Sequence, residues 1–190
     1  MRLIFICISL LITTCVHAQD TLPFLEIKPA IGVTWITVKP TVSVMAFHQF
    51  TPKFSIASHS MLSFLLFRNF PQEYIKTNYN YALTQKLGIG YSLYGPKGKT
   101  RHTILIMGGI KYTAFSETLD NPELEKITTA THRITPDYGL MYDLSLGTKK
   151  RTFDARLYFP FYPIRYYPLG TVSNIGYLEL GLGFKLNRRR

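Results

Sequence analysis

Cysteine is scarce in this sequence, and both cysteines lie close to its start. Cys7 and Cys15 fall within the first 18 of the 190 residues. The rest of the chain therefore cannot form a disulfide, a zinc–thiolate site or a cysteine nucleophile. His102 and His132 show no ligand spacing such as H-x-x-x-H. We expect no metal and no cofactor.

Long apolar runs are also lacking, and charged residues are few. After the first 18 residues, no segment holds eighteen consecutive apolar residues, which argues against a transmembrane helix. Asp, Glu, Lys and Arg make up 17% of the chain, whereas about 25% is usual in soluble domains. The mean hydropathy is nevertheless close to zero. A membrane β-barrel fits this combination, because its strands alternate apolar and polar residues.

The first residues have the features of an export signal. Arg2 precedes an apolar run from Leu3 to Thr13 that is too short to span a bilayer. Val16-His17-Ala18 then fits the small-residue cleavage pattern of a secretory signal peptide. We expect residues 1–18 to be removed and residues 19–190 to form one domain. A lipoprotein signal ending at Cys15 is the alternative, although Thr14 is unusual before such a cysteine.

Alternation of apolar and polar residues is the main structural signal. In segment 177–186 the leucines and Phe184 face one side, while Glu179 and Lys185 face the other. Similar alternation occurs in segments 26–35, 81–93, 139–146 and 153–159, and weaker candidates are 41–49, 54–67 and 102–114. The sequence therefore predicts about eight strands.

Short and long connections alternate between these strands. Turn-like links are expected at 51–53, 95–99 and 148–150, and long links at about 68–78, 115–134 and 160–174. Outer-membrane barrels combine short periplasmic turns with long outer loops in this way. The link near Lys39-Pro40 is short, so the first two segments could instead be one long bent strand. The predicted fold is all-β, a closed antiparallel up-and-down transmembrane β-barrel.

The closing segment resembles a known kind of barrel. Gly176-Tyr177-Leu178-Glu179-Leu180-Gly181-Leu182-Gly183-Phe184-Lys185-Leu186 looks like the terminal strand of small, porin-like outer-membrane β-barrel proteins of the Bacteroidota type. The resemblance extends to the export signal and the strand–turn rhythm. It implies the cell outer membrane and insertion by the barrel-assembly machinery, which reads an aromatic or apolar final residue. Here Asn187 and three arginines follow, so Phe184 or Leu186 would have to serve.

Charges of both signs are expected inside the barrel. Eight strands leave an interior just wide enough for side chains, and buried charges require partners. We therefore expect a plugged barrel, with a diffusion pore as the alternative. Lys86 and Lys111 should also point inward. The interior ion-pair candidates are Glu26, Lys28, Asp143, Asp154, Arg156, Glu179 and Lys185.

The loops are where binding is expected. Loop 115–134 holds four acidic residues and could carry a short helix, and loop 160–174 is unusually aromatic. The interaction candidates are Phe161, Tyr162, Arg165, Tyr166 and Tyr167. The net charge of +11 favours contact with outer-membrane lipid or lipopolysaccharide, and an unknown surface or periplasmic partner is expected. Nucleic acid is not, because no helix-turn-helix or zinc-finger pattern accompanies the charge.

The predicted function is non-enzymatic, a structural or surface-binding role in the outer membrane. Ser58-His59-Ser60, with His48 nearby in sequence, is the only patch that suggests a lipid-A-modifying barrel enzyme. Adjacent strand residues point to opposite faces, so His59 and Ser60 cannot act as a pair. A soluble periplasmic lipocalin-like barrel that binds an apolar ligand stays open, because the alternation is the same whichever face points inward.

Overall fold

The computed structural model describes most of the chain beyond residue 23. The described residues are 24–35, 39–64, 74–95, 98–120, 122–123, 125–147, 150–161, 164–166, 171–173 and 176–186. The expected signal peptide, residues 1–18, and the terminal arginines lie outside them. No helix within these ranges is long and apolar enough to cross a membrane.

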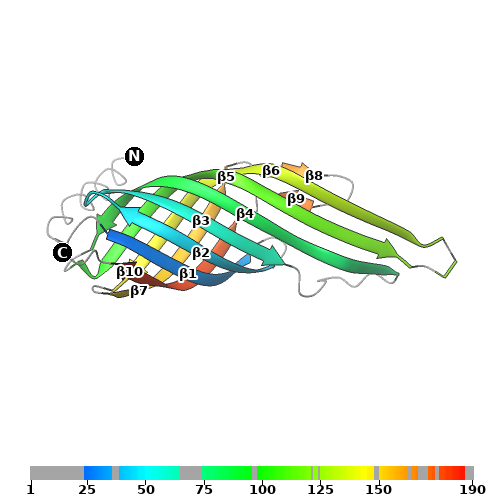
Figure 1. The fold of residues 1–190 in the computed structure, drawn as a ribbon, viewed down its shortest axis with the longest axis horizontal. Helices are drawn as coiled ribbons and strands as arrows, with labels where there is room; N and C mark the ends of the chain where they lie inside the picture. The colour runs from blue at the N-terminus through cyan, green and yellow to red at the C-terminus, as the bar shows by residue number, and fades with distance from the viewer. Residues whose placement is uncertain are drawn as a thin grey trace, which may run out of the picture.

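Eight strands close into an antiparallel barrel in the order β1-β10-β7-β6-β5-β4-β3-β2, and β8 and β9 form a small separate sheet (Figure 1). The predicted fold is confirmed. The strands are β1 (Phe24–Thr34), β2 (Pro40–Gln49), β3 (Phe54–Phe64), β4 (Ile75–Tyr94), β5 (Thr100–Leu119), β6 (Ile127–Leu146), β7 (Arg151–Pro160), β8 (Ile164–Tyr166), β9 (Thr171–Ser173) and β10 (Tyr177–Leu186). Because β1 and β2 pair as separate strands, the alternative of one bent strand is wrong.

The barrel closes between its first and last strands. Leu25 lies opposite Leu186, and Thr34 lies opposite Tyr177. Every strand of the closed part therefore has a neighbour on both sides, which satisfies the backbone hydrogen-bonding groups without water. The ends of β2, β4 and β6 and the starts of β3, β5 and β7 lie at one end, here named the turn end, together with the start of β1 and the end of β10. The opposite end is named the loop end.

Strands β4, β5 and β6 are each 20 residues long and continue past the loop end as a three-stranded sheet (Figure 1). Their neighbours stop earlier, since β3 ends at Phe64 opposite Tyr81 and β7 ends at Pro160 opposite Gly139. The prediction of a loop over 115–134 is wrong, because residues 115–119 belong to β5 and 127–134 to β6. Residues 127–134 are all exposed, so this part of β6 carries no alternation that sequence analysis could detect.

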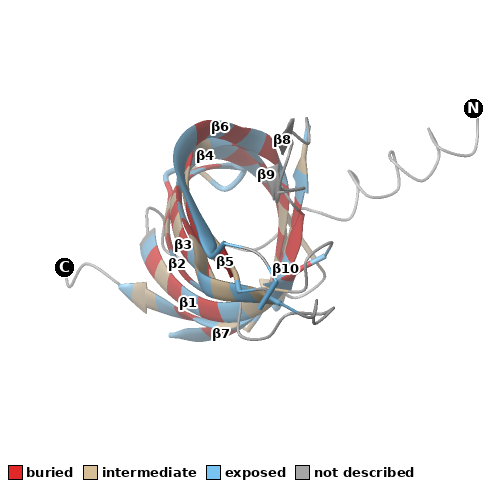
Figure 2. Ribbon diagram, turned by 90° about the vertical axis from the view of Figure 1, so that its right-hand side faces the viewer, coloured by how far each residue is buried: buried red, intermediate tan, exposed pale blue. Residues whose placement is uncertain are grey.

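The two faces of the barrel wall differ sharply in chemistry. In the closed part of the barrel, buried residues alternate with exposed or half-buried ones along the strands, as the banding in Figure 2 shows. Along β1, Glu26 and Lys28 are fully buried in the interior, whereas Ile31 is 69% exposed on the outside. The other strands of the barrel show the same arrangement, with an apolar outer face and a largely polar interior. A small apolar layer, which includes Met45, Phe47 and Met141, packs within that interior.

Candidate functional site

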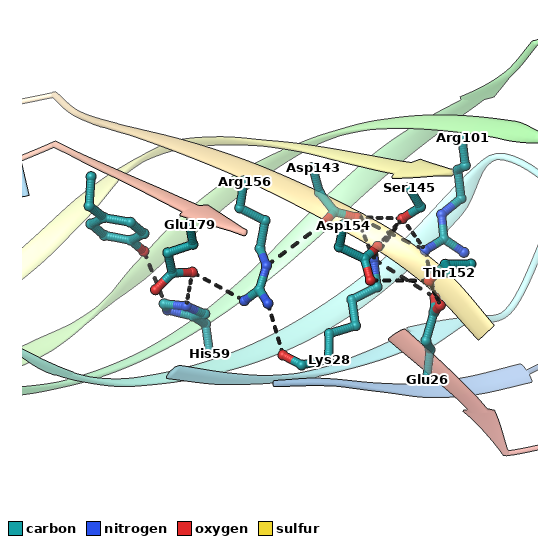
Figure 3. A network of polar contacts seen from close by, with 11 residues as sticks. Glu26, Lys28, His59, Arg101, Asp143, Ser145, Thr152, Asp154, Arg156 and Glu179 are labelled. Atoms are coloured by element: carbon teal, nitrogen blue, oxygen red, sulfur yellow. Dashed lines mark hydrogen bonds and ion pairs between the residues drawn. The ribbon is translucent and has the colours of Figure 1, made fainter. Parts of the chain in front are cut away.

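The turn-end half of the interior is built around the ammonium group of Lys28. Its Nζ lies 2.6 Å from Asp143 Oδ2 and 2.8 Å from Asp154 Oδ1, and it donates to the Ser145 hydroxyl at 2.8 Å (Figure 3). Arg101 on β5 reaches across the lumen and places Nη2 2.6 Å from Glu26 Oε2. The side chains of Lys28, Asp143 and Asp154 are inaccessible to solvent, so these charges are stabilised by one another.

The middle of the interior joins β3, β7 and β10. Arg156 Nη1 lies 3.2 Å from Glu179 Oε2, and its Nη2 donates to the Lys28 carbonyl at 2.8 Å (Figure 3). His59 Nε2 lies 3.1 Å from the same Glu179 oxygen. The hydroxyl of Tyr177 lies 3.3 Å from His59 Nδ1, and the two rings stack. His59 thus contacts a carboxylate and a phenol.

The loop-end half is held by Lys86 and Asp137. Lys86 Nζ lies 3.0 Å from Asp137 Oδ2 and 3.4 Å from the centre of the Tyr158 ring. The Tyr158 hydroxyl donates to Asp137 at 2.6 Å.

Beyond the strands, in the link between β1 and β2, Lys39 Nζ donates to Asn80 at 2.6 Å. Burial and the positive charge of Lys111 lower the pKa of Lys39 to about 8.

These contacts place paired side chains across the lumen. The pocket at the turn end, which Arg101, Ser145 and Lys185 help to line, has a volume of about 10 Å³. That volume corresponds to roughly one water molecule. At this end of the lumen, the described side chains therefore leave little free space.

The structure brings six of the seven interior candidates together. Glu26, Lys28, Asp143, Asp154, Arg156 and Glu179 form the buried network described above. Lys185 is half-buried at the turn end, opposite Glu26 in the β1–β10 register.

The loop candidates are placed only in part. Phe161 is 53% exposed and its ring centre lies 6.3 Å from that of Tyr138. Arg165 and Tyr166 belong to β8, where only the backbone is described. Tyr162 and Tyr167 lie outside the described residues.

Sequence analysis missed His59, Arg101 and Asp137 as members of the network. His59 has the same parity as the inward-facing Ala57 and Met61, so strict alternation along β3 could have found it. Arg101 falls between the predicted turn at 95–99 and the predicted strand at 102–114, although it is the second residue of β5. Asp137 lay between a predicted loop and a predicted strand, and only the length of β6 places it inside.

Among the described residues, the other polar patches considered from the sequence do not come together. Ser58 and Ser60 lie on the outer face, opposite to His59. His102 Nδ1 lies 2.6 Å from the Tyr142 hydroxyl, and His132 lies between Tyr79 and Tyr112 on the outside. In the part of the chain that the structure describes, no three His, Cys, Asp or Glu residues are grouped so that they could hold a metal ion.

Aromatic residues mark both ends of the outer apolar face. Near the turn end, Phe54 and Tyr91 pack edge to face at 5.6 Å. Near the loop end, Tyr81 and Tyr112 belong to a cluster that also contains Tyr79 and His132. Tyr91 lies ten positions after Tyr81 in β4, which gives a height of about 23 Å for a strand tilted by about 45°. The apolar band of membrane barrels is about 25 Å tall.

Comparison with known proteins identifies the fold. No family model and no curated protein matches the chain. Among solved structures, Neisserial surface protein A matches with a TM-score of 0.52 and 11% identity over 86% of this chain and 94% of that one. The N-terminal β-barrel domain of Pseudomonas aeruginosa OprF matches with a TM-score of 0.52 and 13% identity, over 86% and 97%. Ail of Yersinia pestis, crystallised with the heparin analogue sucrose octasulfate, matches with a TM-score of 0.45 and 9% identity over 86% and 97%. The chain has the fold of small eight-stranded outer-membrane barrels.

Proposed function

We propose that this chain is a non-enzymatic outer-membrane protein, a plugged barrel that anchors a surface-exposed binding sheet. The observation that carries the proposal is the inverted wall, with apolar side chains outside and paired charges inside. Such an exterior is stable in hydrocarbon and unfavourable in water. A soluble lipocalin-like barrel would require the reverse arrangement, so the structure disfavours that alternative.

The orientation in the membrane follows from the connections. Outer-membrane barrels have short turns on the periplasmic side and longer loops outside. With that polarity, the extension of β4, β5 and β6 projects from the cell surface. Residues 127–134 expose both faces of β6 there, which supports a surface-binding role for this sheet and for segment 160–174.

Export and insertion complete the proposal. The features of residues 1–18 support a cleaved signal peptide, and the closing strand supports recognition by the barrel-assembly machinery and an origin among Bacteroidota-type barrels. The net charge of +11 supports contact with lipopolysaccharide, whose phosphates are anionic. Nucleic acid is not among the proposed partners.

Fractionation with surface proteolysis tests the proposal. The protein should be recovered in outer membranes and migrate differently in detergent gels before and after boiling. Protease added to intact cells should cut near residues 120–126 and leave the barrel protected. Recovery in the soluble periplasm would refute the membrane assignment, and steady single-channel conductance in planar bilayers would refute the plugged interior.

A further inference from the structure

A polar group interrupts the apolar outer face of the barrel. Ser58 and Ser60 of β3 point outward on the same face as Ile56 and Leu62. Gln85 of β4 is exposed between them: its Nε2 donates to the Ser58 hydroxyl at 2.9 Å, and its Oε1 accepts a hydrogen bond from Ser60. These three residues are named the Gln85 triad.

The triad lies at the middle of the outer apolar face. Gln85 is four residues from Tyr81 and six from Tyr91, the aromatic residues of β4 near the two ends of that face. Ser58 and Ser60 lie near the middle of β3, between Phe54 and Phe64. If the barrel spans a membrane, as proposed above, the Gln85 amide lies near the centre of the hydrocarbon, where no water is available to it.

The triad leaves half of the amide's hydrogen-bonding capacity unused. A glutamine amide has two N–H donors and two acceptor lone pairs. Ser58 accepts from one donor, and Ser60 donates to one lone pair. One N–H and one lone pair therefore have no partner among the described residues, and burying them in lipid without partners is unfavourable.

Small residues and apolar grooves surround the triad on the outer face of the barrel. Ala46 on β2 and Gly108 on β5 are small residues of the same outer face, and a Cβ added at Gly108 would meet nothing within 4 Å. Two apolar grooves adjoin the triad. One, of about 480 Å³, is lined by Val44, Leu83 and Ile110. The other, of about 580 Å³, is lined by Ala46, Leu87 and Ile106.

We propose that the β2–β5 face around the Gln85 triad is a dimer interface that binds a second copy of this chain within the membrane. The proposal rests on the membrane function proposed above. A second copy fits because an amide with one free donor and one free acceptor is complementary to itself, as a two-fold interface requires. Lipid chains could fill the grooves, but they offer the amide no partner. In membranes, small residues and Ser or Gln side chains are typical of such protein–protein contacts.

Cysteine cross-linking tests the interface. The probe is Gly108→Cys in a full chain with Cys7→Ser and Cys15→Ser, so that no other thiol can react. The matched control is Leu182→Cys, which is exposed on β10 at the opposite side of the barrel. Oxidation of outer membranes should give a disulfide-linked dimer with Gly108→Cys and not with Leu182→Cys. Equal cross-linking at both positions, or capture of a different protein at Gly108→Cys, would overturn the proposal.

Two further variants test the chemistry in phosphatidylcholine vesicles. Gln85→Leu removes the amide but suits lipid, and it should weaken association about tenfold, the effect of one or two hydrogen bonds in a membrane. Gly108→Leu should also weaken it, because the new side chain has space in its own barrel but obstructs a neighbour. Energy transfer between labelled copies at increasing protein density measures both effects. Heat-modifiable migration of each variant shows separately that the barrel has folded and inserted. A folded chain that stays monomeric at every density refutes the dimer and leaves the proposed function intact.

Discussion

Lys28→Met is the sharpest test of the plugged interior. Lys28 Nζ lies within 2.8 Å of oxygens from Asp143, Asp154 and Ser145, and 3.8 Å from Glu26 Oε2. Removing this cation leaves two solvent-inaccessible carboxylates without their shortest ion pairs. Breaking a buried pair in this way costs about 3–5 kcal/mol. If the free energy of unfolding falls by about 2 kcal/mol per molar of urea, the urea concentration at the unfolding midpoint should fall by roughly 2 M.

The assay is urea unfolding of the folded barrel in lipid vesicles, followed by gel mobility without boiling. Lys126→Met is the matched control. Lys126 Nζ lies 3.3 Å from Asp120 Oδ2, and both side chains are exposed. Exposed ion pairs contribute less than about 1 kcal/mol. Adding Asp154→Asn to Lys28→Met should restore part of the loss, because it removes one unpaired charge. If Lys28→Met and Lys126→Met have the same midpoint, the interior charges do not stabilise the barrel as argued.

Three further outcomes are expected from single substitutions. Gly109→Ala should destabilise the barrel by about 1–3 kcal/mol in the same assay, because its Cβ would meet the Gln85 carbonyl and the Lys86 Cα; Gly108→Ala, with open space around its Cβ, should be neutral. Tyr158→Phe should cost about 1–2 kcal/mol, since the Tyr158 hydroxyl donates to the buried Asp137; an unchanged midpoint would contradict this. Because its pKa is lowered to about 8, Lys39 should react with an amine-acylating reagent with a midpoint near pH 8 instead of about 10.4. Lys111→Met should raise that midpoint by removing a like charge, and mass spectrometry of the labelled peptides measures it.

The closed part of the barrel could be predicted from sequence because its strands alternate apolar and polar residues. Each strand there has one apolar outer face and one face toward a largely polar interior, so residues such as Leu180 and Glu179 alternate. The same alternation indicated that Asp154 and Arg156 share a face. It could not say which face points inward, because an inverted barrel has the same pattern. Only the closed three-dimensional arrangement resolves this.

The β4–β6 extension could not be predicted for the opposite reason. Both faces of β6 are exposed from Ile127 to Ile134, so no burial constrains the sequence there. These residues form a strand because β5 pairs with them, residue by residue, from Leu119 opposite Ile127. The sequence also could not predict which charged residues pair with each other in the interior network. Arg101 meets Glu26 because β5 and β1 face each other across the lumen, and sequence separation carries no information about that distance.

The cross-lumen contacts also limit where this protein can act. Lys28 on β1 binds carboxylates of β6 and β7, and Glu179 on β10 contacts His59 on β3, with more than a hundred residues between the partners. Such contacts form only after the barrel has closed, and they then tie its opposite walls together. Opening a passage would require several of these buried charges to separate at once, at a cost that each broken pair increases. Under the proposed function, recognition is therefore expected on surfaces that can change partners without separating these charges, namely the β4–β6 extension and the outer wall around Gln85.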